Sequence, residues 1–200
     1  MNPAAGPANP CTGGSARGVG KIREIAKAHE EAKRQELKAL DNDALYIKIY
    51  YRSGGLNNFH WSLYHHRSWR AGGTKFHIQG TPGQAWNPDH GQTMGALAST
   101  GLLAMMRIRA PVSQAANVVA GIITEKDELL SDRKDMTCRI YVQEACERLK
   151  SRGLLNFNRW TELEAEVFAL GNRENPVLGG EMQSGNSVMP RPVVISAVAS

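Results

Sequence analysis

Imidazole and thiol side chains are the groups in this chain that could support nucleophilic or acid–base catalysis. Four of the six histidines, His60, His65, His66 and His77, crowd into a short stretch that contains predicted strands. Side chains of a strand alternate between its two faces, so His60 and Trp61 must point in opposite directions. The pattern leaves open which of those two side chains faces a helical layer. A neighbouring strand through His77 would bring its imidazole beside that of His60.

Cys138 stands near the start of a predicted helix that follows a polar link. At that position the unpaired N–H groups and the positive end of the helix dipole favour a thiolate. A nearby imidazole would complete a cysteine–histidine couple, in which His60 is the predicted base and His77 or Gln79 orients its ring. Cys146 lies about two turns further along the helix and is predicted to be a small buried hydrophobe.

These histidines could instead bind a metal ion. A zinc site would use His60, His65, His66 and His77, but His65 and His66 are neighbours in a predicted link, and a catalytic zinc site needs three ligands at fixed geometry. We therefore predict no metal and no cofactor.

Lysine and arginine are scattered, and aromatic residues do not interleave with them. That pattern argues against nucleic acid as a partner, despite a net charge of +5.

Cysteine usage and hydrophobicity bear on where the protein works. The cysteines at 11, 138 and 146 are odd in number and form no CxxC pair, which argues against a disulfide framework and a cysteine zinc site. No apolar run is long enough for a membrane helix, and the N-terminus lacks the pattern of a signal peptide. We therefore predict a cytoplasmic protein with no membrane span, whose partner is a small-molecule or acyl substrate.

Short β-branched and aromatic runs alternate with turn residues in the first half of the chain, which is typical of an antiparallel meander. Helical periodicity dominates the second half. Pro111 ends a run that we interpret as a strand, and Gly153 stands where a helix end needs a left-handed residue. The predicted strands are 45–51, 59–64, 75–79 and 102–108, and the predicted helices are 114–123, 136–152 and 160–170, the last stopped by Gly171.

Composition divides the chain into parts. Residues 1–17, rich in Pro, Gly and Ala, predict a disordered arm, and residues 18–43 predict a solvated helix rich in Ala, Glu and Lys. Residues 44–171 are predicted to form one α+β domain, in which a small antiparallel sheet packs against the helix that bears Cys138. Residues 172–200 return to Gly, Pro, Ser and Asn and predict a flexible C-terminal tail, in which the apolar VVISAVAS is either a docked strand or unstructured.

Three motifs, FHWSLY, KFHIQG and TCRIYVQEACERL, occur in this order along the chain. They resemble the motifs of the permuted papain-like thiol fold, which lecithin:retinol acyltransferase-like proteins and NlpC-like peptidases share. They are also similar to an uncharacterised fungal family with the pattern HWAL…NCRxWV. The resemblance covers residues 45–155, and it implies that His60 is the base, His77 the second histidine and Cys138 the nucleophile.

Two positions depart from that pattern, because Thr137 replaces the usual Asn and Tyr141 replaces the Trp of the fungal family. Threonine can also cap a helix. The leading prediction is a thiol-dependent acyl-transfer enzyme, a hydrolase, acyltransferase or cyclase, with an oxyanion site at the start of the Cys138 helix. The alternative is a non-catalytic interaction module that keeps the fold. Substrate contacts are predicted at Gln79 and at Trp86, which lies in a stretch without periodicity.

Overall fold

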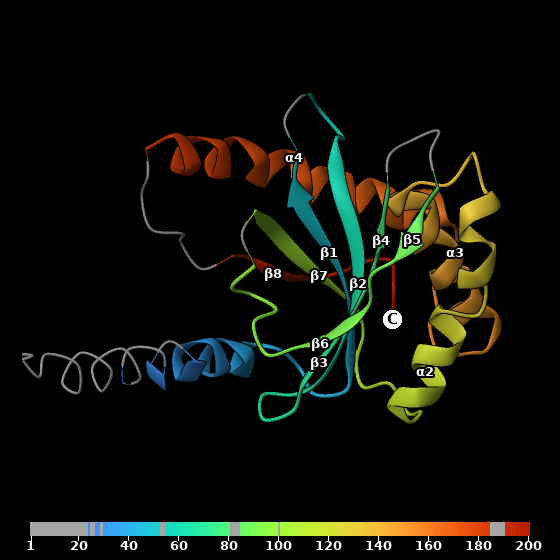
Figure 1. Cartoon of the computed structure of the whole chain (residues 1–200), viewed down its shortest axis with the longest axis horizontal. Coiled ribbons are helices and arrows are strands. Elements are labelled where there is room, and N and C mark those ends of the chain that lie inside the picture. The colour runs from blue at the N-terminus through green and yellow to red at the C-terminus, as the bar shows by residue number, and fades with distance from the viewer. Residues whose placement is uncertain are drawn as a thin grey trace, which may run out of the picture. The chain divides into compact units, whose positions relative to one another are not determined.

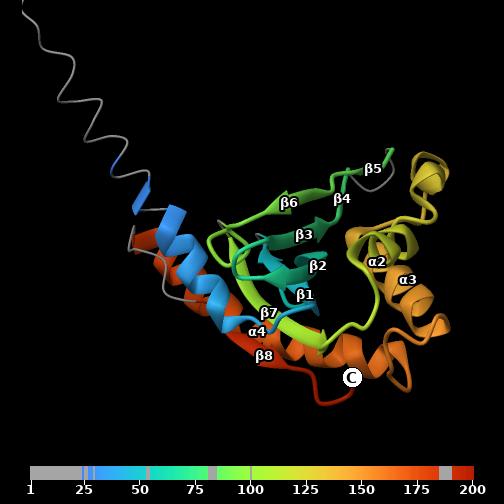
Figure 2. The ribbon, with the colours of Figure 1, turned by 90° about the horizontal axis from the view of Figure 1, so that it is seen from below.

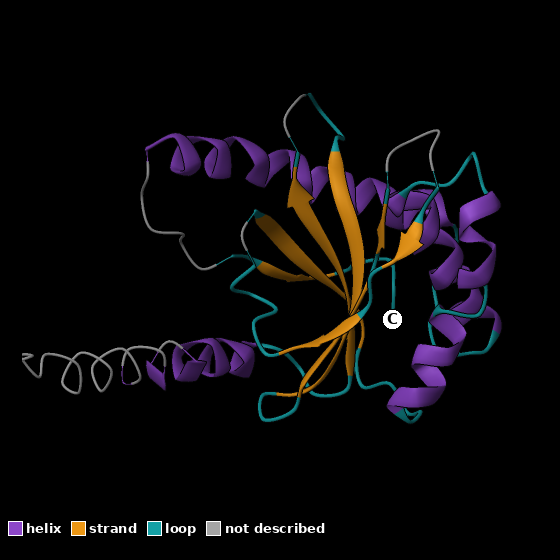
Figure 3. Cartoon of the chain, viewed as in Figure 1, coloured by secondary structure: helices purple, strands orange, loops and turns teal. Residues whose placement is uncertain are grey.

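The computed structural model describes residues 24, 27–28, 30–52, 55–80, 85–99, 101–184 and 191–200, with side chains as far as 176 in the last helix. Contacts divide the chain into two units, Met1–Ala32 and Lys33–Ser200. The second unit contains every element named below. It combines helices with a mixed sheet, which confirms the predicted α+β class (Figure 3). The predicted arm, residues 1–17, lies outside the described residues.

A mixed sheet in the order β6-β3-β2-β1-β7-β8 forms the centre of this unit, and β4 and β5 pair in a separate small sheet (Figure 1). The predicted meander is confirmed, since β1 pairs antiparallel with β2, and β2 with β3. Among the described strands, β8 alone runs parallel to its neighbour, β7. The strands are β1 (Ala44–Tyr51), β2 (Phe59–Ser68), β3 (Gly72–Phe76), β4 (Ile78–Gln79), β5 (Asn87–Pro88), β6 (Gly91–Thr93), β7 (Leu102–Arg109) and β8 (Val193–Ile195).

Helix α3 packs on β2 and on α2, while α4 packs on β1 and β7 (Figure 2). Helix α3 begins one residue after Thr137, whose hydroxyl accepts a hydrogen bond from the Ile140 N–H at 3.1 Å. Gly153 follows its end with φ +71°, as predicted. No helix in the described part of the chain is long and apolar enough to cross a membrane. The helices are η1 (Leu37–Ala39), α2 (Ala116–Ile123), η2 (Asp127–Asp132), α3 (Cys138–Ser151) and α4 (Trp160–Ser184).

The central strands present different side chains to the two faces of the sheet. Ile49 and Trp61 belong to the large apolar cluster that the sheet shares with the helices. The Trp61 ring lies 6.2 Å from that of Trp160 and 5.5 Å from that of Phe168, both in α4. Trp61 therefore faces the helical layer, and strand alternation turns His60 to the opposite face. The structure thus decides the alternative that the sequence leaves open.

A second, smaller apolar cluster lies on that opposite face. Tyr46 and Tyr64 belong to it, together with Leu37 and Leu40. Residues 33–36 are helical and mostly exposed, and they lead into η1, where Leu37 is fully buried. The predicted solvated helix therefore ends in a buried anchor on the sheet.

The prediction that Gly171 stops the last helix is wrong, because α4 continues to Ser184. A Cβ added to Gly171 would lie 2.5 Å from the Phe59 ring. The glycine therefore permits a close approach between α4 and β2. The predicted flexible tail, 172–200, likewise contains ordered elements, since the last helix runs into it and β8 pairs with β7. Strand β8, near the apolar C-terminal end, thus covers the β7 edge of the main sheet.

The predicted third strand, 75–79, is divided in the structure. Phe76 ends β3 in the main sheet, while Ile78 begins β4 in the small sheet. Both side chains are buried in the large apolar cluster, and His77 lies between them. The break therefore releases His77 from regular pairing at the place where the two sheets meet.

Candidate functional site

A groove opens on the face of the sheet away from the helices. It has a volume of about 430 Å³. Its walls come from the ends of β1 and β2, from β3 and its link to β4, and from the loop after β6. We call it the basic groove, and its lining residues are Tyr50, Tyr51, Arg52, His60, Lys75, His77 and Ser99.

A chain of hydrogen bonds runs through the basic groove, and we call its members His60, His77 and Asp89 the histidine relay. The His60 Nε2 atom lies 2.9 Å from His77 Nδ1, and His77 Nε2 lies 2.7 Å from Asp89 Oδ2. At the other end, Arg52 Nη2 lies 3.3 Å from His60 Nδ1. The predicted meeting of His60 and His77 is therefore present in the structure.

The partners of the relay fix the direction of each hydrogen bond. An ionised carboxylate only accepts, so the His77 Nε2–H donates to Asp89 and its Nδ1 is an acceptor. The His60 Nε2–H then donates to His77, which leaves His60 Nδ1 to accept from the Arg52 guanidinium. Every donor thus points from Arg52 toward Asp89. Both imidazoles are in defined tautomers, with Nε2 protonated.

Burial keeps these imidazoles neutral. It lowers the pKa of His60 to about 4, and the charges of His77, Arg52 and Lys75 act in the same direction. Burial also lowers the pKa of His77, although the hydrogen bond with Asp89 opposes that shift. The His77 hydrogen bond in turn holds the pKa of Asp89 below its usual value. The relay therefore stands with neutral imidazoles and an ionised carboxylate at neutral pH.

Asp89 is held by more than the relay. Lys75 Nζ lies 3.3 Å from Asp89 Oδ2, and the Gln79 side-chain amide donates to the same oxygen. Gln79 is exposed and does not line the groove, so the structure gives it a role in orienting the relay carboxylate. Arg52, Lys75 and Asp89 are site residues that the sequence analysis missed. Arg52 and Asp89 are common charged residues outside the three motifs, and Lys75 opens the KFHIQG motif without a recognised role in it, so residue type alone gave no signal.

Lys48 is fully buried on the same face of β1 as Tyr50, one of the residues that line the basic groove. Its Nζ donates to the Ala96 carbonyl at 2.7 Å and lies 5.1 Å and 5.5 Å from the ring centres of Tyr50 and Tyr64. Burial, with a smaller effect of Lys75, lowers the Lys48 pKa to about 7. At neutral pH this buried amine is therefore only partly protonated, and the positive charge of the groove comes mainly from Arg52 and Lys75.

Cys138 does not reach this site. Its side chain is 3% exposed and belongs to the large apolar cluster with Trp61, on the helical side of the sheet. His60 points to the other side, so the sheet separates the two groups of the predicted couple. In the described part of the chain, no hydrogen bond involves the Cys138 thiol. The sequence correctly predicted that His60 lies on a strand and Cys138 near the start of a helix, but it could not say which face of β2 carried His60.

The other predicted residues are also placed by the structure. Trp86 is 2% exposed and packs in the large apolar cluster, so it is a core residue and does not line the groove. His65 and His66 are buried, and His66 Nδ1 lies 3.1 Å from the Tyr64 hydroxyl. Among the described residues, no group of three or more His, Cys, Asp or Glu side chains is arranged to hold a metal ion.

Comparisons of the chain with protein-family models, with curated proteins and with solved structures find no match. The likeness to the permuted papain-like fold thus stays a prediction from short motifs. The geometry of the basic groove and of the histidine relay is what carries a functional interpretation.

Proposed function

We propose that this chain is a hydrolase of small anionic acyl esters, in which His60 is the general base and His77 and Asp89 support it. The observation that carries the proposal is the directed hydrogen-bond chain from Arg52 to Asp89. A base oriented by a second polar group, itself tied to a carboxylate, is the arrangement that proton transfer requires.

The charges around the groove favour an anionic substrate. Arg52 and Lys75 line it. Asp89 also touches Lys75, but no carboxylate is among the described residues that line the groove. A guanidinium binds a carboxylate or phosphate through paired hydrogen bonds, so Arg52 is the natural contact for a charged end of the substrate.

Anion binding and base activation are coupled through Arg52. In the structure both nitrogens of His60 are engaged, because Nδ1 accepts from Arg52 and Nε2 donates to His77. An anion that draws the guanidinium toward itself exposes Nδ1. It also offsets the positive charges that lower the pKa of His60, so that pKa rises toward the range of a useful base.

The chemical steps follow from that exposure. Nδ1 of His60 takes a proton from water while the water oxygen forms a bond to the acyl carbon. Asp89, through His77, compensates the positive charge of the imidazolium, and Lys75 faces the negative charge on the acyl oxygen. The bond between the acyl carbon and the leaving oxygen then breaks, and His60 returns its proton to that oxygen. The products are the acid and the alcohol.

This mechanism keeps the predicted acyl chemistry and replaces the attacking group. Cys138 lies on the other side of the sheet, so water takes the place of the thiol. Hydrolysis is accordingly favoured over the transfer and cyclisation that a thiol intermediate would allow. The predicted cytoplasmic setting, which rests on the cysteine usage and on the lack of a signal-peptide pattern, remains part of the proposal.

The test compares two esters that differ in one charge: the 4-nitrophenyl monoester of adipic acid and its methyl-capped neutral counterpart. We expect kcat/KM to be at least about 10-fold higher for the anionic ester, a preference that Arg52→Gln removes. His60→Gln keeps a donor toward His77 but has no basic nitrogen, and it should lower kcat about 100-fold or more. The wild-type kcat/KM should fall only as the pH approaches the His60 pKa of about 4.

Cys138→Ala is the matched control, because it removes the thiol and leaves the groove intact. Activity close to wild type in Cys138→Ala supports water as the attacking group. Loss of activity in that variant would overturn the mechanism in favour of the thiol. Binding of adipate without turnover of either ester would identify the alternative, a non-catalytic binding module.

A further inference from the structure

A second histidine–carboxylate pair lies behind the relay. His90 Nε2 is 2.7 Å from Asp127 Oδ2, in η2, and His90 Nδ1 is 3.2 Å from the backbone nitrogen of His77. A backbone N–H only donates, so His90 Nδ1 accepts and its Nε2–H donates to Asp127. The ring therefore links the main chain of a relay residue to a carboxylate on a separate element.

Aromatic neighbours hold the His90 ring. Its centre lies 5.9 Å from that of Tyr141 with an angle of 29° between the planes, and 5.5 Å from that of Phe76. The Tyr141 hydroxyl is 3.3 Å from His90 Nε2. Tyr141 is itself buried in α3, less than one turn after Cys138. Packing and hydrogen bonds together leave the imidazole one position.

The small sheet needs this support. Each of its strands has two residues, and both residues of β5 are exposed, so it has little stability of its own. Yet this sheet carries the relay: Asp89 follows β5 directly, and its N–H donates to the His77 carbonyl at 2.9 Å. His90 is the next residue along the chain. The His90 ring thus accepts a hydrogen bond from the His77 backbone, and a peptide bond joins His90 to Asp89.

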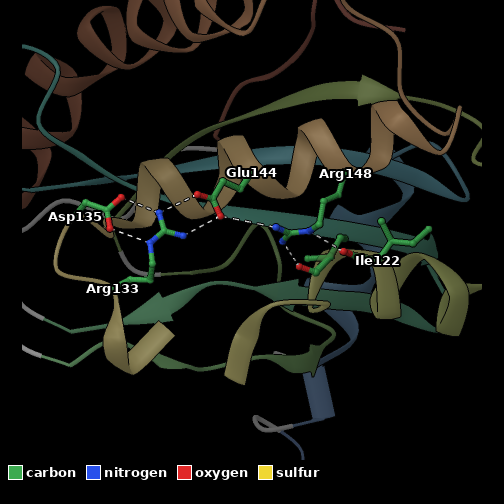
Figure 4. Close-up of polar contacts among 6 residues, drawn as sticks. Ile122, Arg133, Asp135, Glu144 and Arg148 are labelled. Atoms are coloured by element: carbon green, nitrogen blue, oxygen red, sulfur yellow. Dashed lines mark hydrogen bonds and ion pairs between the residues drawn. The ribbon is translucent and has the colours of Figure 1, made fainter. Parts of the chain in front are cut away.

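The elements behind Asp127 are fixed by a network of ion pairs and hydrogen bonds (Figure 4). Arg148 of α3 donates to the Ile122 carbonyl at 3.0 Å, which ties α3 to α2. Arg133 bridges Asp135 at 2.8 Å and Glu144 at 3.0 Å, which ties the segment after η2 to α3. The carboxylate that receives the His90 N–H therefore belongs to an anchored framework.

We propose that His90 is a positioning residue of the histidine relay, which holds the His77 backbone and Asp89 in place by tying them to Asp127 and Tyr141. This inference rests on the proposed function for its catalytic consequence. Its structural part is independent of activity: His77 keeps one tautomer, and keeping that tautomer depends on His90. The helix that was predicted to carry a nucleophile thereby becomes the support for the relay.

The experiment uses the full chain and reads the imidazole nitrogens by ¹⁵N NMR, without substrate, beside kcat and KM for the anionic ester. Asp127→Ala removes the acceptor for His90, while Asp127→Asn keeps an oxygen there and should rescue it. His90→Phe keeps the stacking on Tyr141 and removes both hydrogen bonds. Glu128→Gln is the control, since Glu128 is an exposed neighbour of Asp127 in η2.

We expect Asp127→Ala and His90→Phe to replace the separate protonated and unprotonated nitrogen signals of His77 with averaged ones. Their kcat should fall about 10-fold with little change in KM, as when the partner that orients a functional group is lost. Asp127→Asn and Glu128→Gln should behave as wild type. Fixed His77 signals in both His90→Phe and Asp127→Ala would overturn the inference.

The same data separate this inference from the proposed function. If the wild type hydrolyses neither ester but the His77 signals still depend on His90, the proposed hydrolysis fails and the positioning role stands. If the wild type is active and the signals do not move in these variants, the positioning role fails and the hydrolysis stands.

Discussion

Lys48 shows that burying a basic side chain costs stability. The folded chain holds its pKa at about 7, against 10.5 for an exposed lysine. Between those pH values the unfolded chain binds a proton that the folded chain does not. Stability should therefore rise with pH across this range, by at most about 1.4 kcal/mol per pH unit.

Lys48→Met tests that account, because it keeps the length of the side chain and removes the buried charge. We expect it to raise the free energy of unfolding at pH 7 by about 1 to 4 kcal/mol and to flatten the rise between pH 7 and 10.5. Urea unfolding at several pH values measures both effects. Lys134→Met is the control at an exposed position and should change neither. A lower stability in Lys48→Met would mean that the ammonium stabilises the fold through its contacts with Ala96 and the tyrosine rings.

At the scale of elements, the contact between α4 and β2 depends on a glycine. Alanine has the higher helix propensity, by about 1 kcal/mol, so propensity alone predicts that Gly171→Ala stabilises the protein. The Cβ would lie 2.5 Å from the buried Phe59 ring, however, so the ring or the helix must shift. We expect a net destabilisation of about 1 to 3 kcal/mol by urea unfolding.

Gly121→Ala in α2 is the matched substitution, because nothing lies within 4 Å of its added Cβ. It should be neutral or stabilise by up to about 1 kcal/mol. Equal effects of the two substitutions would show that close packing of α4 on β2 is not what requires Gly171.

For the whole molecule, buried histidines make the fold sensitive to acid. Burial lowers the pKa of His60, His65 and His66 to about 4 each, below the ordinary value of 6.5. As the pH falls from 6.5 to 4, the unfolded chain binds protons that the folded chain does not. Stability should fall through this window by at most about 1.4 kcal/mol per pH unit for each histidine, and by less for the partly exposed His60.

His65→Leu provides the test of this acid sensitivity, because His65 is 1% exposed and a leucine of similar volume needs no proton. The dependence of the urea midpoint on pH between 7 and 4.5 should become shallower in this variant. An unchanged slope would mean that His65 does not contribute to the loss of stability in acid.

Local pattern was enough to predict the meander and the helix that carries Cys138 near its start. Strand runs, a capping threonine and a left-handed glycine each act through neighbours in the chain, so the sequence carries them directly. The end of α4 could not be predicted in this way, because the reason for Gly171 is its close packing against the Phe59 ring of β2, which is distant in the sequence. The same holds for β8, whose three residues pair with the edge of β7, far from them in the sequence.

The sequence by itself determined which residues could do chemistry, whereas the tertiary structure decided which of them meet. Alternation along β2 fixed that His60 and Trp61 point apart, and only the packing of Trp61 on α4 showed that His60 faces away from Cys138. Asp89 joins the relay because the fold brings its segment beside that of His77, and no sequence pattern links these two segments. Side-chain direction relative to a core depends on what else the chain brings to that core, and local propensity does not contain that information.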